Sequence, residues 1–286
     1  MRGYGRTIII QPGMISSLAE WEALREKLSR YGRVIVYNRA GCGRSNKGMT
    51  SRNLKENAKD LYALIKKLNI TSPILLGHSY GGLILQQFAH DYPSVASGFI
   101  LVDSTSYEAY KLDAVEIEGE YSNNTEAWIN KCKTYSRLSK EELHKEMKDW
   151  INELKKLLPN SSYREIENFM SNPSMFETLS EELENDLLSG RDTNQSKSFP
   201  DTPALIIGRD PKASILEMVE SEGLHNSEAE EIENIWQMLI HNQTKINSQA
   251  SYCLAKGSGH SVHFEKPEVI EKAVHSILDS TQIEKY

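Results

Sequence analysis

The stretch Pro73-Ile74-Leu75-Leu76-Gly77-His78-Ser79-Tyr80-Gly81-Gly82 decides the fold of this chain. An apolar run typical of a buried strand stops at Gly77, and a helical pattern follows at once with Leu83, Ile84, Leu85, Phe88 and Ala89. The Gly-x-Ser-x-Gly spacing predicts a turn so tight that a Cβ at Gly77 or Gly81 would collide with neighbouring backbone. In this strand–turn–helix context the Ser79 hydroxyl stands clear of the strand, beside the N-terminus of a helix, where a developing oxyanion is stabilised.

Short apolar runs alternate with helical patterns over much of the chain, which indicates an α/β fold with a mostly parallel central sheet flanked by helices. The predicted strands are Thr7–Gln11, Arg33–Tyr37, Pro73–Gly77, Gly98–Val102, Ala204–Ile207 and Ala250–Ala255. A helix after Asn53 is indicated by the one-sided spacing of Leu54, Ala58, Leu61, Ile65 and Leu68, with Glu56 completing a capping pattern. The long stretch between Asp210 and His260 is expected to include a helix around Glu230–His241, and a final helix begins near Pro267.

The segment from about residue 107 to residue 200 contains helical patterns and no convincing strand. Helix starts are indicated by Ser139-x-x-Glu142 and Ser162-x-x-Glu165, and a third helix by Leu179, Leu183 and Leu187. We therefore predict a core formed by residues 1–106 and 201–286, with residues 107–200 inserted as a helical cap. Because ligands bind at the carboxyl end of open α/β sheets, we expect the cap to cover that end. A surface insertion without a role at the site is the alternative.

Composition excludes several classes of protein. Of the 286 residues, 39% are hydrophobic and 26% charged, as in ordinary globular proteins, and no apolar run approaches the roughly 18 residues of a membrane span. The formal net charge of −7 and the absence of a basic cluster predict no nucleic-acid partner. Three scattered cysteines and no secretory leader pattern favour the cytoplasm. We expect a small-molecule substrate, no cofactor, no metal, no membrane partner, and a monomer or homodimer.

Four segments, in order along nearly the whole chain, resemble the α/β-hydrolase fold family. They are Ile8-Ile9-Ile10-Gln11-Pro12-Gly13-Met14, Val36-Tyr37-Asn38-Arg39-Ala40-Gly41-Cys42-Gly43-Arg44-Ser45, the turn around Ser79, and Gly259-His260 ahead of Glu265-Lys266-Pro267-Glu268. The chain departs from the family where Gln11-Pro12-Gly13 replaces the common His-Gly and where Asn38 replaces Asp. We expect little effect from either change, since the first position contributes backbone and the second is structural. The hairpin that commonly precedes the first strand is expected to be missing or short, which leaves a sheet edge for a partner chain to cover.

The resemblance implies a catalytic triad in the order serine, acid, histidine. Carried over, it gives Ser79 as nucleophile, Asp210 as acid and His260 as base; Asp103 is the alternative acid, because it also follows a predicted strand and some members of the fold use that position. His260 is favoured over His263 because the small residues Gly257-Ser258-Gly259 precede it, whereas His263 is expected to pack or hydrogen-bond nearby.

The backbone N–H groups of Met14 and Tyr80 are the expected oxyanion donors. His78 is expected to pack beside the turn, and Trp128, Trp150 and Trp236 receive no role.

These observations predict a serine hydrolase that cleaves a small carboxylic ester through an acyl-enzyme on Ser79. Within the same fold, the alternatives are a C–C bond hydrolase and an aminopeptidase, for which an acidic cluster in the cap would bind the amine. A non-catalytic receptor for a small ligand is a third alternative, since receptors built on this fold can retain the triad. Serine rather than a carboxylate at position 79 argues against haloalkane dehalogenases and epoxide hydrolases.

Overall fold

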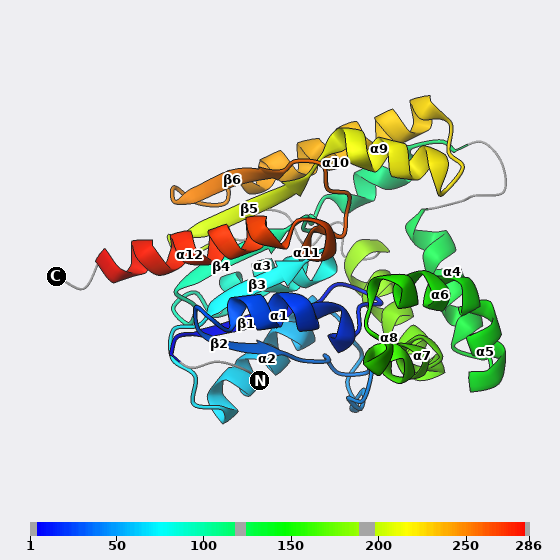
Figure 1. Cartoon of the computed structure of the whole chain (residues 1–286), viewed down its shortest axis with the longest axis horizontal. Coiled ribbons are helices and arrows are strands. Elements are labelled where there is room, and N and C mark those ends of the chain that lie inside the picture. The colour runs from blue at the N-terminus through cyan, green and yellow to red at the C-terminus, as the bar shows by residue number, and fades with distance from the viewer. Residues whose placement is uncertain (1–4, 118–123, 189–197, 284–286) are drawn as a thin grey trace.

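The computed structural model describes residues 5–117, 124–188 and 198–283 (Figure 1). Within these ranges six strands form one sheet in the order β2-β1-β3-β4-β5-β6, and every neighbouring pair is parallel. They are β1 (Thr7–Gln11), β2 (Arg33–Val36), β3 (Ile74–His78), β4 (Gly98–Val102), β5 (Ala204–Arg209) and β6 (Ala250–Ala255). The predicted parallel sheet and its six strands are confirmed, and no strand end differs from its prediction by more than two residues.

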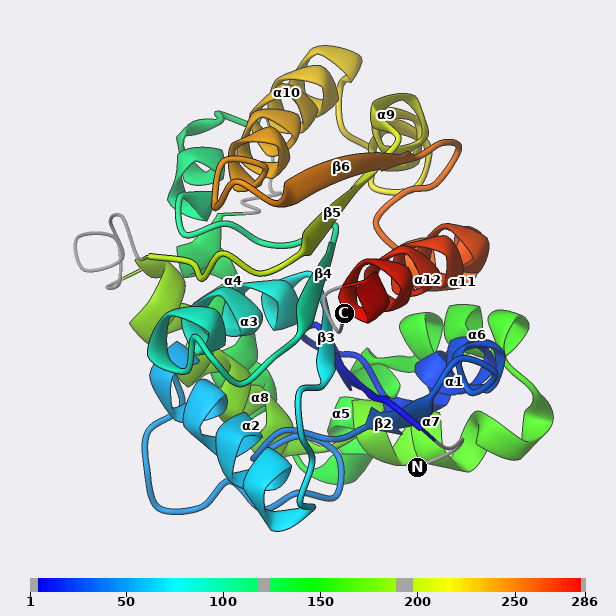
Figure 2. The ribbon, with the colours of Figure 1, turned by 90° about the vertical axis from the view of Figure 1, so that its left-hand side faces the viewer.

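The side chains of the central strands alternate between two layers of helices, which explains why these strands are mostly apolar on both faces. In β1, Ile8 and Ile10 join the core beneath α1 (Glu22–Leu28) and α12 (Pro267–Ile283). Ile9 points the other way, into the core beneath α2 (Leu54–Lys67) and α3 (Tyr80–Asp91). Figure 2 shows α1 and α12 on one face of the sheet, and α2, α3 and α10 (Asn226–Gln243) on the other.

Most predicted helices of the core are present. The Asn53 side chain accepts a hydrogen bond from the backbone N–H of Glu56 at 2.9 Å and so caps α2, and α12 begins at Pro267. The helix expected near residues 230–241 is α10, which is longer. Sequence patterns missed α9 (Pro211–Glu220), whose N-cap is Asp210. The short helices η1 (Leu18–Trp21) and α11 (Val262–Glu265) complete the core.

The register of the parallel strands brings the chemistry-bearing loops to one edge of the sheet. Gln11 pairs with Gly77, and His78 pairs with Val102, so β1, β3 and β4 end side by side. The loop after β1, Ser79 after β3 and Asp103 after β4 therefore emerge together, because the carboxyl ends of parallel strands lie at the same edge.

All the secondary-structure elements that the structure describes in the inserted segment (residues 107–200) are helical. The segment contains η2 (Ala109–Ala114), α4 (Thr125–Tyr135), α5 (Lys140–Glu146), α6 (Lys148–Leu157), η3 (Asn160–Ser162), α7 (Tyr163–Met170), α8 (Pro173–Glu182) and the π-helical turn η4 (Leu183–Leu188). Helices α4 to α8 gather at one end of the molecule (Figure 1) and share an apolar core that includes Leu143, Ile166 and Phe176.

The two predicted capping boxes of the inserted segment have different outcomes. Ser139 and Glu142 form the predicted box at the start of α5. Ser162 precedes α7 but makes no side-chain cap; instead, the Glu165 carboxylate accepts a hydrogen bond from the backbone N–H of Ala19 at 3.1 Å. A contact with the core thus replaces the local cap.

Two further observations concern membranes and cysteines. Among the helices of the described ranges, none is both long and apolar enough to cross a bilayer. Cys42, Cys132 and Cys253 are free thiols.

Candidate active site

Ser79 lies between β3 and α3. Its backbone has φ 54° and ψ −128°, a conformation that residues other than glycine rarely adopt. A Cβ on Gly77 would lie 2.7 Å from the carbonyl oxygen of Gly81, and a Cβ on Gly81 would lie 2.2 Å from the carbonyl oxygen of Gln11. Glycine is therefore required at both positions, as the sequence predicts. Strained residues of this kind concentrate at functional sites.

Backbone hydrogen bonds hold this strained turn in place. The Ser79 N–H donates to the carbonyl of Val102 at 3.1 Å, and its own carbonyl accepts from Gly82 at 2.8 Å and from Thr105 at 3.1 Å. These bonds attach the turn to α3 and to the chain that leaves β4. They involve only the backbone of Ser79 and leave its hydroxyl group unbound by them.

The loop after β1 passes next to Ser79. A Cβ on Gly13 would lie only 3.1 Å from the Cβ of Ser79, so the bare backbone of this loop faces the serine. Both residues predicted as oxyanion donors therefore lie near Ser79. Tyr80 follows it in the sequence as the first residue of α3, and Met14 follows Gly13, whose backbone lies next to the serine.

The carboxylate that contacts His260 belongs to Asp103. His260 Nδ1 donates to Asp103 Oδ2 at 2.6 Å, and the Asp103 side chain is fully buried while that of His260 is 38% exposed. Asp103 itself has a positive φ of 39°, which turns its side chain back toward the histidine loop at the carboxyl edge of the sheet. The contact expected of Asp210 is thus made by the alternative acid.

Three further groups surround the Asp103 carboxylate. The indole Nε1 of Trp236 donates to Oδ1 at 2.8 Å, the backbone N–H of Arg209 donates to Oδ1 at 3.3 Å, and the Arg209 guanidinium lies 3.7 Å from Oδ2. Burial alone would raise the pKa of Asp103, but the Arg209 charge and the hydrogen bonds from His260 and Trp236 hold that pKa below its usual value. The carboxyl group is therefore ionised at neutral pH.

Asp210 has different partners. Its Oδ1 accepts from the backbone N–H of Lys212 at 3.0 Å and caps α9, and its Oδ2 accepts from the backbone N–H of Gly257 at 2.7 Å. These bonds, with that from Gly257 the largest, lower the pKa of Asp210. Asp210 therefore connects α9 to the start of the histidine loop, whereas Asp103 contacts the imidazole.

The residue before the serine connects the two halves of the site. His78 Nε2 donates to the main-chain carbonyl of His260 at 2.9 Å, and the two rings lie 4.6 Å apart between centroids. Burial lowers the pKa of His78 to about 3, so this imidazole is neutral. His263 packs, as predicted: its ring stacks on Trp21 with 4.2 Å between centroids and 9° between planes.

Two residues of the site, Trp236 and Arg209, were not predicted from the sequence. Helix α10 supplies Trp236, and also Glu233, whose carboxylate pairs with the Arg209 guanidinium at 2.5 Å. The signal for Trp236 was the predicted helix between Asp210 and His260, since this helix packs against β5, the strand that ends at Arg209. Trp128, by contrast, contacts Lys131 on its own helix, and Trp150 is 41% exposed.

A cavity of about 830 Å³ opens beside His260, between η2, α9 and α10. Trp236 and Arg209 line it, together with apolar side chains from the inserted segment and from α9 and α10 (Leu112, Val115, Met218 and Ile232). Four carboxyl side chains also line it: Asp113, Glu116, Glu217 and Glu222. Burial, reinforced by the nearby Glu265, raises the pKa of Glu217.

Three relatives illustrate what the chain resembles. The Bacillus subtilis (strain 168) protein YqjL is 20% identical over 274 residues, which cover 96% of this chain and 83% of YqjL. A 2-(acetamidomethylene)succinate hydrolase of Mesorhizobium japonicum is 32% identical over 116 residues, or 40% of this chain and 42% of that enzyme. The solved structure of a thermophilic esterase from Thermogutta terrifontis superimposes with a TM-score of 0.62 and 19% identity, covering 98% of this chain and 91% of the esterase. At that identity the superposition shows the fold alone.

The family model for the alpha/beta hydrolase fold matches residues 6–267. This match runs from the residue before β1 to the first residue of α12 and so includes every strand of the sheet. The chain therefore belongs to the alpha/beta hydrolase fold family, as its four motif segments predicted.

Proposed function

We propose that this chain is a serine hydrolase that cleaves carboxylic esters through an acyl-enzyme on Ser79, with His260 as base and Asp103 as the acid that orients it. The observation that carries the proposal is the 2.6 Å hydrogen bond from His260 Nδ1 to Asp103. A proton fixed on Nδ1 leaves the lone pair on Nε2, which is the atom a general base needs. The His78 bond to the His260 carbonyl places this imidazole beside the turn that carries Ser79.

In the acylation step, His260 Nε2 removes the Ser79 hydroxyl proton as Oγ attacks the ester carbonyl carbon. The carbonyl oxygen becomes an oxyanion that accepts hydrogen bonds from the backbone N–H groups of Met14 and Tyr80. The intermediate then expels the alkoxide, which takes the proton from His260 Nε2 and leaves as an alcohol, so that Ser79 carries the acyl group. The ionised Asp103 stabilises the imidazolium formed in between.

Deacylation repeats these steps with water as the nucleophile. His260 Nε2 takes a proton from water, hydroxide oxygen attacks the acyl carbon, and the proton returns to Ser79 Oγ as the carboxylic acid is released. The same imidazole serves both half-reactions, which requires that it keep its orientation. The carboxylate of Asp103, surrounded by Trp236 and Arg209, supplies that orientation.

One feature of the chain favours acyl substrates over epoxides and haloalkanes, and one solved structure of this fold supplies an analogy to esters. A serine stands at the elbow, whereas epoxide and haloalkane hydrolysis on this fold requires a carboxylate nucleophile there. The Thermogutta terrifontis structure, which covers nearly the whole chain, is that of an esterase. Because one triad serves several acyl substrates, this second support is an analogy of fold.

The proposal is tested by turnover of p-nitrophenyl esters with acyl chains from acetate to decanoate, measured for the wild type and for Ser79→Ala and His260→Ala. We expect the wild type to hydrolyse the shorter esters, and both variants to lose at least about 10³-fold in kcat. Circular dichroism and thermal unfolding check that each variant is folded. Undiminished turnover by folded Ser79→Ala contradicts the proposal, and binding without turnover by the wild type favours a receptor.

A second candidate, favoured by the four carboxyl side chains in the cavity beside His260, is hydrolysis of a substrate with a free amino group. Negative charge in a cavity with partly apolar walls attracts a cation. The two candidates separate when alanine p-nitroanilide and alanine p-nitrophenyl ester are compared with their N-acetyl forms. A higher kcat/KM for the free amines supports this candidate, and equal values exclude it.

A further inference from the structure

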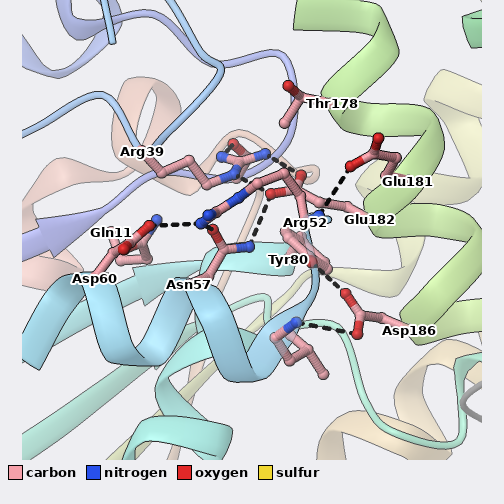
Figure 3. Close-up of polar contacts among 12 residues, drawn as sticks. Gln11, Arg39, Arg52, Asn57, Asp60, Tyr80, Thr178, Glu181, Glu182 and Asp186 are labelled. Atoms are coloured by element: carbon pink, nitrogen blue, oxygen red, sulfur yellow. Dashed lines mark hydrogen bonds and ion pairs between the residues drawn. The ribbon is translucent and has the colours of Figure 1, made fainter. Parts of the chain in front are cut away.

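Three acidic side chains of the inserted segment contact the core at Arg39, Arg52 and Tyr80 (Figure 3). Glu181 and Glu182 end α8, and Asp186 lies in the π-helical turn η4 that follows. The helix approaches the core closely: a Cβ on Gly41, whose φ is +82°, would lie 2.0 Å from Thr178 Oγ1. π-helical turns are rare and often occur at functional sites.

Glu182 is connected to the loop after β1 through Arg39. Its two carboxylate oxygens accept from Nε and Nη2 of Arg39, both at 2.8 Å, and both side chains are buried. The third arm of the guanidinium, Nη1, donates to the carbonyl oxygen of Gly13 at 2.9 Å. Asn57 donates a further bond to Glu182 at 2.8 Å, so the carboxylate has a fixed position.

The Gly13 carbonyl belongs to the same peptide unit as the N–H of Met14. That unit is planar, and in a trans peptide the C=O and N–H bonds point in opposite directions. A guanidinium that fixes the carbonyl oxygen therefore also fixes the direction of the Met14 N–H, which is the proposed oxyanion donor. Arg39 thus holds the carbonyl end of this peptide, opposite the proposed oxyanion donor.

Asp186 makes the corresponding contact on the other side of the oxyanion hole. The Tyr80 hydroxyl donates to Asp186 Oδ2 at 2.6 Å, and the backbone N–H of Leu54 donates to Oδ1 at 3.0 Å. Tyr80 is 2% exposed, and the Arg39 guanidinium lies 5.4 Å from the centre of its ring. The side chain of the residue with the second proposed donor is thus fixed at both its ring and its hydroxyl.

Stability alone does not explain the Arg39–Glu182 pair. Taking two charges out of water costs about as much as their attraction returns, so a buried ion pair is weak evidence for a stabilising role. The pair does supply a rigid, directional contact to Gly13, since the planar guanidinium binds the carboxylate with two bonds and the carbonyl with a third.

We propose that Glu182 and Asp186 are positioning residues through which the inserted segment sets the geometry of the oxyanion hole: Glu182 acts through Arg39 on the Gly13–Met14 peptide, and Asp186 acts through the Tyr80 side chain. The inference rests on the proposed serine-hydrolase function. It implies that displacement of α8 and η4 weakens both oxyanion donors together, while Ser79, His260 and Asp103 keep their contacts.

The test compares Glu182→Gln and Tyr80→Phe with Glu181→Gln. Glu181 is the matched control because it also joins the inserted segment to the core, through Lys47 at 2.6 Å and the backbone N–H of Arg52 at 2.9 Å, without contacting Arg39 or Tyr80. For each protein, the active fraction is titrated to completion with a fluorophosphonate. The kcat and KM for p-nitrophenyl acetate, and the inhibition constant of an alkyl trifluoromethyl ketone, are then measured per active site.

We expect Glu182→Gln and Tyr80→Phe to lower kcat about 10–100-fold with KM nearly unchanged, which is less than the roughly 10²–10³-fold cost of deleting an oxyanion donor. The inhibition constant of the ketone, whose adduct with Ser79 carries an oxyanion, rises by a similar factor. Glu181→Gln stays within about twofold of the wild type in both.

A merely structural role changes the active fraction and leaves these per-site values unaltered, and that result overturns the inference. Equal losses in all three variants overturn it as well. If Glu182→Gln does not fold, Tyr80→Phe carries the test by itself. Failure of the wild type to react at Ser79 removes the proposed function and this inference together, whereas a reactive wild type with unaffected variants removes the inference alone.

Discussion

Asp103 and His260 are 157 residues apart in the sequence, yet a 2.6 Å hydrogen bond joins Oδ2 of the one to Nδ1 of the other. Asp103 follows β4, the strand next to β3, and the pairing of Val102 with His78 places it beside the serine turn. The histidine loop reaches this position from the far side of β5. Asp103 and Ser79 therefore follow neighbouring strands, whereas His260 comes from the loop after β6, two strands away from β4.

The roles of the Asp103 and Asp210 carboxylates are separated by replacing each with asparagine. We expect Asp103→Asn to lower kcat for an ester by about 10³–10⁴-fold, because an amide at this position favours the wrong tautomer of His260. Asp210→Asn should lower kcat less than about tenfold, since asparagine still caps α9 and the imidazole contact is untouched. The measurement is steady-state kinetics on both variants; a larger loss in Asp210→Asn would contradict the assignment of the acid.

Trp236→Phe removes the indole N–H that donates to Asp103 and keeps most of the ring. A hydrogen bond to a charged group is worth about 1.5–3 kcal/mol, part of which is lost from the imidazolium-bearing transition state, so we expect a decrease in kcat of about tenfold with little change in KM. Trp128→Phe, on α4 of the inserted segment, is the control. Identical kinetics for Trp236→Phe and the wild type would show that Arg209 alone holds the carboxylate.

The fold could be predicted because its strands and its serine turn each have a recognisable pattern within a few consecutive residues. Both faces of the sheet are covered, so its central strands contain continuous apolar runs such as Ile74-Leu75-Leu76, and the tight turn at Gly77 and Gly81 has a fixed spacing. Helix α9 was missed because its N-cap, Asp210, was interpreted as a catalytic acid. Its first residue, Pro211, is a favoured start for a helix and was the available signal.

The choice between Asp103 and Asp210 could not be made from local patterns. Asp103 and Asp210 each follow an apolar strand, and nothing in either segment states which carboxylate the histidine loop reaches. The deciding contacts span long separations: Trp236 lies 133 residues from Asp103, and Glu182 lies 143 residues from Arg39. Such pairs depend on where α10 and α8 pack in the folded chain, which single-sequence periodicity does not specify.

The buried histidine His263 predicts how stability depends on pH. Neither of its ring nitrogens has a hydrogen-bond partner in the described part of the chain, and burial holds its pKa well below the usual value. As the pH falls below about 6.5, the unfolded chain binds a proton that the folded chain does not, so the free energy of unfolding decreases.

His263→Phe keeps the stack on Trp21 and removes the titrating ring. We therefore expect the variant's free energy of unfolding to decrease less on acidification than that of the wild type, by about 1 kcal/mol per pH unit below pH 6. Urea unfolding at pH 5, 6 and 7 measures it, with the exposed His275→Gln as control. If His263→Phe and the wild type lose stability in parallel on acidification, His263 is protonated in the folded protein and the prediction is wrong.

Glu20 has the opposite pH dependence. It is 8% exposed, and burial raises its pKa to about 7 although its carboxylate accepts a bond from the Ser17 N–H. Between about pH 4.3 and pH 7 the folded chain holds a proton that the unfolded chain releases, so the free energy of unfolding falls as pH rises.

Glu20→Gln removes this titration and keeps the acceptor oxygen. Between pH 5 and pH 8 we expect the free energy of unfolding of the wild type to fall by about 3 kcal/mol relative to that of the variant. Thermal or urea unfolding across that range gives the difference, and Glu26→Gln, an exposed change on α1, should follow the wild type. Parallel curves for Glu20→Gln and the wild type would mean that Glu20 titrates normally.

We propose that Ser79 is an activated nucleophile, and covalent labelling with a fluorophosphonate measures that activation. Intact-mass spectrometry with peptide mapping follows the adduct in the wild type and in folded His260→Ala. The proposal predicts one adduct per chain, on Ser79, formed far more slowly in the variant. A folded wild-type protein that forms no adduct, or that forms it at the same rate without His260, would contradict the claim.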